Sequence, residues 1–144
     1  MEDCNGTARV IGVLLVDDHG VVREGLAVLL QQDPRIKIIG TATTGREAVE
    51  AARRLNPDVV VMDLVLPELS GIDATQRIRT ELPNTSVVIL SACDSSEHIA
   101  CALRAGASGY VLKGSVAADQ AALIRFAIQH ALIPAAVRGM RLTK

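Results

Sequence analysis

The sequence has few aromatic residues: tryptophan is absent, and Tyr110 and Phe126 are its only tyrosine and phenylalanine. Long apolar runs are lacking too, because Asp17 and Asp18 interrupt the longest early run and none approaches the roughly 18 residues of a membrane span. The first ten residues are polar and acidic, without the basic and then apolar pattern of a secretory signal. We therefore expect a cytoplasmic protein that makes no contact with a membrane.

Cysteines are few and odd in number. Cys4, Cys93 and Cys101 lack the CxxC spacing of a zinc site or redox motif. They indicate reduced thiols, which excludes a disulfide framework. Cys93 and Cys101 are eight positions apart, so a helix would bring them roughly to one face, and we expect both to be small core residues.

Excess charge of either sign is also missing, since the formal net charge is -1. Three basic residues, Arg138, Arg141 and Lys144, lie in the last eleven positions, where there is no acid. The remainder is slightly acidic, which suits nucleic-acid binding poorly.

Short apolar runs rich in valine and isoleucine alternate with segments of helical spacing. Each run is too short for a typical helix and is bounded by turn or polar residues, as buried strands are. The runs are Ile11–Val16, Ile36–Ala42, Val59–Met62, Val87–Leu90 and Gly109–Leu112. Helical spacing follows each of them, first in Val22, Leu26, Leu29 and Leu30 and last in Ala122, Ile124, Phe126 and Ile128. This alternation predicts an α/β fold, a doubly wound five-stranded parallel sheet with helices on both faces.

Helix boundaries are marked by capping and breaking residues. Thr43 or Thr44 can cap a helix, and Glu47 completes a capping box three residues after Thr44. Asn56 ends that helix because it precedes a proline, and Gly106 offers a stop for a later one.

Polar side chains stand where four of the predicted strands end. Asp17 and Asp18 follow the first strand, Asp63 the third, Ser91 the fourth and Lys113 the fifth. The functional crevice of such a sheet lies beyond the carboxyl ends of its strands, so these groups are expected to converge. A single aspartate after a strand is more often a helix cap, but independent caps have no reason to fall at four strand ends together.

Converging carboxylates repel one another unless a cation lies between them. Mg²⁺ is the cation that suits oxygen ligands and phosphoryl oxygens. A carboxylate held in such a site can accept a phosphoryl group as an acyl phosphate. Lys113 and Ser91 would then neutralise or hydrogen-bond the phosphoryl oxygens.

The same residues resemble the receiver domain of response regulators, the CheY-like family of two-component systems. The resemblance covers about residues 9–130 and is carried by VDDH at 16–19, VVVMDLVLPELSG at 59–71, VVILSA at 87–92 and RAGASGYVLKGS at 104–115. It implies the flavodoxin-like strand order 2-1-3-4-5. It also implies a switch that accepts a phosphoryl group and dephosphorylates itself slowly at most, rather than an enzyme.

The resemblance also implies a role for each matching residue. Asp63 is the phosphoacceptor, and Ser91, Tyr110 and Lys113 are the groups that respond to the phosphoryl group. Mg²⁺ is held by Asp18, by Asp63, by the backbone carbonyl of Val65 and, through a water, by Asp17.

Pro67 and Gly71 match the turn after the acceptor strand, where glycine relieves backbone constraint. His19 is assigned no catalytic role. Val65 and Cys93, each two residues past a key position, are expected to line the path of the hydrolytic water. We add the hypothesis that apolar Val65 slows dephosphorylation.

The partners follow from the branch that the chain resembles most, NarL/FixJ (LuxR-type). The donor is expected to be a cognate sensor histidine kinase, and phosphorylation is expected to promote a homodimer. Proteins of this branch carry a helix-turn-helix output domain, through which alone DNA would be bound. We expect a receiver domain over residues 9–130, a linker start and basic tail over 131–144, and no output domain within this chain.

Three alternatives remain open. A stand-alone receiver or phosphorelay intermediate would have no DNA-binding output. A flavodoxin-like flavin binder would share the fold, but Asp17 and Asp18 would repel its phosphate and aromatics to cover the flavin are scarce. An aspartyl phosphatase would carry a DxDx arrangement, which is absent around Asp63.

Overall fold

The computed structural model describes residues 10–113, 122, 124–125 and 127–129 of the 144-residue chain. Its strands are β1 (Ile11–Val16), β2 (Ile36–Ala42), β3 (Val59–Asp63), β4 (Ser86–Ser91) and β5 (Gly109–Leu112). Three of them have the predicted bounds. The third extends to include Asp63, and the fourth gains one residue at each end.

The strands form one parallel sheet in the order β2-β1-β3-β4-β5, which confirms the predicted topology. In the register, Val16 at the end of β1 pairs with Met62, Asp63 with Leu90, and Ser91 with Leu112. The carboxyl ends of β1, β3, β4 and β5 therefore lie at nearly the same level in the sheet. This alignment brings the residues after each strand to one edge of the sheet.

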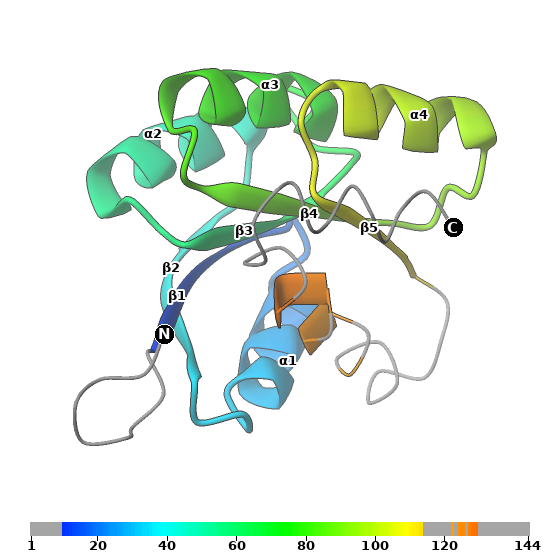
Figure 1. Cartoon of the computed structure of the whole chain (residues 1–144). Coiled ribbons are helices and arrows are strands. Elements are labelled where there is room, and N and C mark those ends of the chain that lie inside the picture. The colour runs from blue at the N-terminus through cyan, green and yellow to red at the C-terminus, as the bar shows by residue number, and fades with distance from the viewer. Residues whose placement is uncertain (1–9, 114–121, 123, 126, 130–144) are drawn as a thin grey trace.

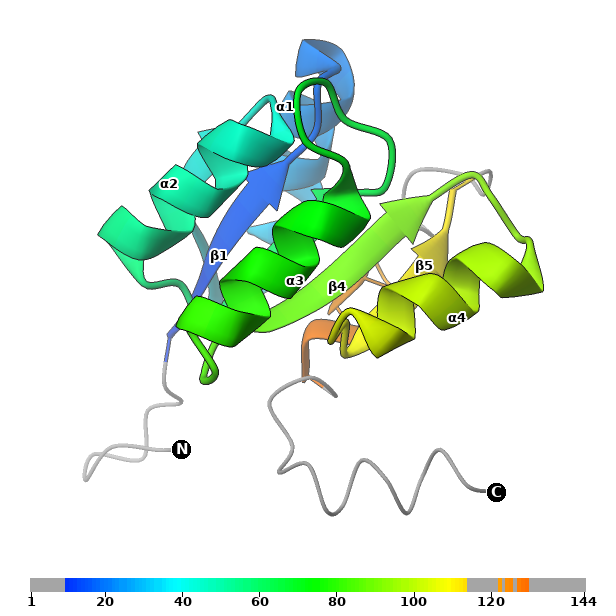
Figure 2. The same ribbon diagram turned by 90° about the horizontal axis from the view of Figure 1, so that it is seen from above.

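Helices cover both faces of the sheet, as Figures 1 and 2 show. The helices α2 (Gly45–Leu55), α3 (Gly71–Glu81) and α4 (Ser96–Arg104) lie on one face, and α1 (Gly20–Leu30) lies on the other. Residues 122, 124–125 and 127–129 are helical and lie beside α1. Among the described residues, no helix combines the length and apolar character needed to cross a bilayer.

Two apolar layers form the core, one under each set of helices. Under α1, the strand side chains pack with Leu26, Leu30, Ile124 and Ile128. Val22 has the helical spacing of Leu26 and Leu30 but is 40% exposed. It lies in the first turn of α1, where Val21 is exposed too, whereas Leu26 and Leu30 are buried further along the helix.

The predicted helix boundaries are confirmed. Thr44 caps α2 and its Oγ1 accepts a hydrogen bond from the Glu47 N–H at 2.9 Å, while Glu47 Oε1 accepts one from the Thr43 N–H at 2.6 Å. Asn56 ends α2 with a φ of 50°, in the left-handed region. Gly106 follows α4 with a φ of 112°, which a residue without a Cβ adopts without strain.

The core placement predicted for the cysteines is wrong. Cys93 and Cys101 are free thiols, but Cys101 is exposed and Cys93 only half-buried. Cys93 precedes α4, which begins at Ser96, so the two residues do not share a helix face. Cys4 lies outside the described residues, as do residues 131–144 of the expected linker and tail.

Candidate functional site

The predicted site residues meet at the carboxyl edge of the sheet. A cavity of about 450 Å³ opens there. It is lined by residues at or just after the carboxyl ends of β1, β3, β4 and β5: Asp18, His19, Asp63, Val65, Ser91, Ala92, Cys93 and Lys113. Asp17 lies beneath them and is buried. The parallel register thus brings together residues up to 96 positions apart in the chain.

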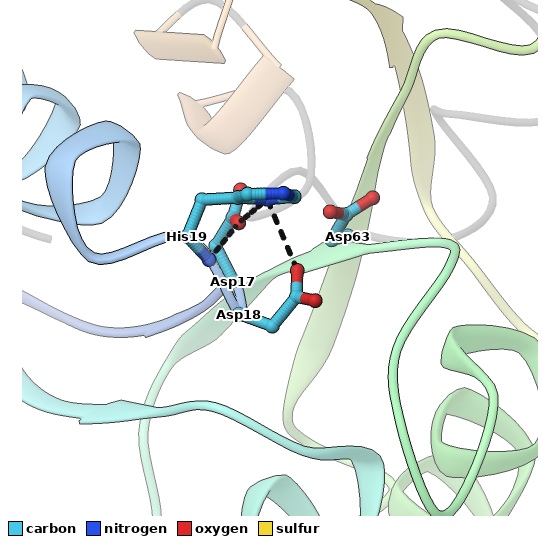
Figure 3. Close-up of side chains that lie close together, drawn as sticks. All are labelled: Asp17, Asp18, His19 and Asp63. Carbon is cyan, nitrogen blue, oxygen red and sulfur yellow. Dashed lines mark hydrogen bonds and ion pairs between the residues drawn. The ribbon is translucent and has the colours of Figure 1, made fainter.

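Asp17, Asp18 and Asp63 form an acidic group at the floor and rim of this cavity (Figure 3). Asp63 and Asp17 are buried, whereas Asp18 is exposed at the rim. Together with His19, they offer four potential ligand atoms that lie within 4.8 Å of one another. Mutual repulsion makes this arrangement unfavourable unless a positive charge is present.

Lys113 supplies part of that charge. Its Nζ donates to Asp63 Oδ2 at 3.0 Å and to Asp17 Oδ2 at 3.3 Å. The Lys113 N–H donates to the Ser91 carbonyl at 2.8 Å, which fixes the backbone from which the ammonium extends. The ammonium therefore bridges the two buried carboxylates.

The pKa values of this pair reflect both burial and charge. Burial raises the pKa of Asp63 above its ordinary value, and neighbouring Asp17 raises it further, although Lys113 opposes both effects. Burial lowers the pKa of Lys113, but its hydrogen bond and attraction to Asp63 and its attraction to Asp17 outweigh that effect and hold the pKa above its ordinary value. One lysine therefore does not fully compensate the burial of Asp63.

Asp17 also has the ordinary role of organising a loop. Its Oδ1 accepts a hydrogen bond from the His19 N–H at 2.9 Å, and its carbonyl accepts one from Arg23 Nη1 at 2.7 Å. These bonds hold the turn between β1 and α1. The second carboxylate oxygen remains directed to Lys113.

Ser91 and Tyr110 meet at the loop that follows β4. Ser91 is buried, and its Oγ accepts a hydrogen bond from the Cys93 N–H at 3.0 Å. The Tyr110 hydroxyl donates to the Cys93 carbonyl at 2.7 Å. Both predicted switch residues therefore hold the same peptide segment, and a shift of Ser91 would disturb the support of Tyr110.

The loop between β3 and α3 lies tightly against the acceptor strand. A Cβ at position 71 would collide with the Asp63 carbonyl oxygen, so Gly71 is required for close approach rather than for a left-handed φ. The left-handed residue of this loop is Glu68, with a φ of 70°. Val65 is 75% exposed, and its N–H has only a long 3.4 Å contact with Asp63 Oδ1.

Sequence reasoning missed one member of the site. His19 lines the cavity with its ring beside Asp17 and Asp18, and its adjacency to the two aspartates was a usable signal. Cys93 lines the cavity, as its position two residues after Ser91 predicts. Its backbone link between Ser91 and Tyr110 was not predicted, because that link is made by peptide groups that every residue has.

The donor set fits a hard divalent cation. Carboxylate oxygens are the ligands that Mg²⁺ prefers. The Oδ1 atoms of Asp17 and Asp18 point toward the same side of the pocket, while Lys113 contacts the Oδ2 atoms of Asp17 and Asp63. The exposed rim also leaves room for the waters that Mg²⁺ retains.

Residues 13–125 match the family model of the response regulator receiver domain. The transcriptional regulatory protein LiaR of Bacillus subtilis is 43% identical over 118 residues, which cover 82% of this chain and 56% of LiaR. The chain spans about half the length of the curated relatives it matches.

Solved structures agree with this match. The signal receiver domain of NarL from Mycobacterium tuberculosis superposes with a TM-score of 0.77 at 28% identity, covering 85% of this chain and 98% of that one. A chain of the CheX–CheY–BeF3⁻–Mg²⁺ complex from Borrelia burgdorferi gives a TM-score of 0.72 at 27% identity, covering 85% and 89%.

Proposed function

This chain belongs to the response regulator receiver domain family, and from that premise we propose that Asp63 is its phosphoacceptor. Receiver domains are regulatory switches of two-component systems rather than classical enzymes. The observation that carries the proposal is the position of Asp63, a buried carboxylate that lines an open cavity between Lys113 and the other aspartates.

The proposed reaction transfers a phosphoryl group from a phosphohistidine to Asp63. A carboxylate oxygen of Asp63 forms a bond to phosphorus while the bond between phosphorus and the imidazole nitrogen breaks, and the nitrogen retains that electron pair. The product is an acyl phosphate on this chain and a free histidine on the donor. Burial favours the step, because a poorly solvated carboxylate is a better nucleophile than a fully hydrated one.

Lys113 and Ser91 are proposed to stabilise the transferred group. The Lys113 ammonium lies 3.0 Å from Asp63 Oδ2, within reach of an oxygen of a phosphoryl group on Asp63. The Ser91 hydroxyl lines the same cavity and can donate to a second oxygen. We propose that Asp18, Asp63 and the Val65 carbonyl hold Mg²⁺ directly and Asp17 through a water; when bound, the ion supplies charge neutralisation at the phosphoryl oxygens.

The proposed switch follows from the hydrogen bonds of Cys93. When Ser91 turns toward a phosphoryl group, its Oγ gives up the bond from the Cys93 N–H. The Cys93 carbonyl, which supports Tyr110, is then free to move. Phosphorylation of Asp63 adds roughly two negative charges beside Ser91, the first residue in this series of contacts. The surface formed by α4 and β5 is thereby altered for a partner.

The partners of the whole protein are also proposals. A sensor histidine kinase is the expected donor, and a homodimer is the expected phosphorylated state. LiaR and MctR are transcriptional regulatory proteins about twice as long as their match to this chain. We infer that DNA is bound through an output domain of the helix-turn-helix type outside this chain. The family match favours this function over the flavin-binding and phosphatase alternatives.

Intact-mass spectrometry tests the proposal. Incubation with acetyl phosphate and Mg²⁺ should add one phosphoryl group to the wild type and none to Asp63→Asn. Asp73→Asn is the matched control, because it makes the same change at an exposed carboxylate on α3 and should be phosphorylated normally. Phosphorylation that survives Asp63→Asn would overturn the assignment.

A further inference from the structure

The His19 side chain lies in the acidic cavity without a part in the proposed phosphoryl transfer. It stands at the N-cap of α1 but makes no capping hydrogen bond to that helix. Instead its ring turns toward the end of β1, where Nδ1 lies 3.2 Å from Asp17 Oδ1 and 3.1 Å from Asp18 Oδ1 (Figure 3). The side chain is 68% exposed, so the ring is positioned by the two carboxylates rather than by apolar packing.

These separations are those of neighbouring ligands around one ion. At metal–ligand distances of about 2.1 Å, adjacent octahedral ligands are roughly 3 Å apart and opposite ligands roughly 4.2 Å apart. Nδ1 lies at the adjacent-ligand distance, 3.1 Å, from Oδ1 of Asp18, the carboxylate proposed to hold the ion directly. Asp17, proposed to act through a water, lies beside the ring at 3.2 Å. One ligand atom from each of Asp17, Asp18, His19 and Asp63 lies within 4.8 Å of the others. Lys113 contacts the Oδ2 atoms of Asp17 and Asp63. The imidazole instead faces the Oδ1 atom of Asp18 and that of Asp17, which also accepts a hydrogen bond from the His19 N–H.

We propose that His19 Nδ1 is a ligand of the cation in this pocket and shifts its preference from Mg²⁺ toward divalent first-row transition ions. The inference rests on the proposed function, because that function places a divalent cation here. Imidazole nitrogen suits ions such as Fe²⁺ and Zn²⁺, whereas Mg²⁺ is bound through oxygen. A transition ion gains a nitrogen bond from His19, while Mg²⁺ gains little from it.

The affinities of Co²⁺ and Mg²⁺, measured by titration calorimetry, test this preference. In His19→Asn the Co²⁺ affinity should fall by at least about tenfold, the lower end of the loss seen when even an outer-sphere partner of a metal ligand is removed. The Mg²⁺ affinity should change by less than about twofold. Asp18→Asn should weaken both ions, because it removes a shared oxygen ligand. His98→Asn is the matched control, since this exposed histidine lies outside the residues that line the cavity.

Pulsed electron paramagnetic resonance with Cu²⁺, a paramagnetic ion that imidazole suits, gives a second readout that reports coordination itself. A directly bound imidazole produces coupling to ¹⁴N, which should be present in the wild type and in His98→Asn and absent in His19→Asn. Lack of this coupling in the wild type, or an equal loss of Co²⁺ and Mg²⁺ affinity in His19→Asn, would overturn the proposal and leave Nδ1 as a hydrogen-bond donor to the carboxylates. Phosphorylation of Asp63 with Mg²⁺ is measured separately, so a failure there would count against the proposed function and not against this ligand.

Discussion

As the proposed phosphoacceptor, Asp63 meets two opposing demands, because it must be ionised and yet lies in a site where ionisation is costly. Burial and the neighbouring Asp17 raise the pKa of Asp63, and Lys113 offsets only part of this effect. The folded protein therefore holds a proton on Asp63 more tightly than the unfolded chain does. It follows that the ionised carboxylate lowers the stability of the fold when no cation is bound.

Asp63→Asn is accordingly expected to stabilise the protein at pH 7 in a chelating buffer, by about 0.5–2 kcal/mol. The sign follows from the raised pKa: the wild type loses stability relative to the variant as the pH rises from the ordinary value of 3.8 through the folded value. Below that window both side chains are neutral and the difference should shrink. Urea unfolding at several pH values measures it, and a destabilised variant at pH 7 would contradict the reasoning.

Val65 is expected to set the lifetime of the phosphorylated state. Its side chain is exposed at the cavity and has no polar atom to orient an attacking water. Val65→Asn should shorten the phosphoryl half-life about two- to twelvefold, the effect of one additional hydrogen bond of about 0.5–1.5 kcal/mol in the transition state. The loss of phosphoprotein is followed by intact mass after the phosphodonor is removed. Val65→Leu keeps the site apolar and should retain the long half-life; an unchanged half-life in Val65→Asn would refute the hypothesis.

At the level of single residues, the sequence predicted which residues belong to the site better than it predicted which of them contact one another. Asp63, Ser91 and Lys113 were found because each stands at a strand end, a position that the apolar runs define. The position of Lys113 at a strand end does not show that its ammonium bridges Asp63 and Asp17, because that contact depends on how β1, β3 and β5 are aligned in the sheet. The ring position of His19 depends on a side-chain rotamer, which no spacing encodes.

At the level of elements, strands were predicted closely because each is a short apolar run bounded by polar or turn residues. Asp63 and Ser91 were left outside their strands, since a polar residue at the end of an apolar run reads as a terminator. Helix faces were predicted less well. Val22 has the spacing of a core residue but lies near the start of α1, where Val21 is exposed too, and spacing does not show how far the sheet extends beneath a helix.

The capping box of α2 gives a prediction at this scale. Thr44→Ala removes the hydroxyl that accepts the Glu47 N–H and should lower the free energy of unfolding by about 1 kcal/mol. Thr44→Ser keeps the acceptor and should lose much less. Urea unfolding of the two variants measures the difference; equal losses would show that the methyl group of Thr44, rather than its hydroxyl, stabilises this end of the helix.

For the whole molecule, the alternation of strands and helices was enough to predict a parallel sheet with two covered faces. The strand order was not contained in that alternation and came from the resemblance to receiver domains. Right-handed crossover connections are compatible with several strand orders, so the alternation of strands and helices does not select one of them. Asp17, Asp63 and Ser91 are buried at one edge of the sheet because β1, β3 and β4 are neighbours in the observed strand order.

The expected assembly is a prediction at the same scale. In sedimentation-velocity experiments, this chain should be a dimer when phosphorylated and a monomer when not. The wild type incubated with acetyl phosphate and Mg²⁺ should gain a species of twice the monomer mass, and Asp63→Asn under the same conditions should remain monomeric. A wild type that is fully phosphorylated yet still monomeric would show that this chain alone does not form the dimer.

Chemical trapping of the modified residue tests the central claim most directly. Borohydride reduces an acyl phosphate to an alcohol, so a phosphorylated aspartate becomes homoserine and can be located by peptide mass spectrometry. After treatment with acetyl phosphate and Mg²⁺, the account predicts homoserine at position 63 and at no other carboxylate. Homoserine at position 17 or 18, or a phosphoryl group that borohydride does not remove, would contradict it.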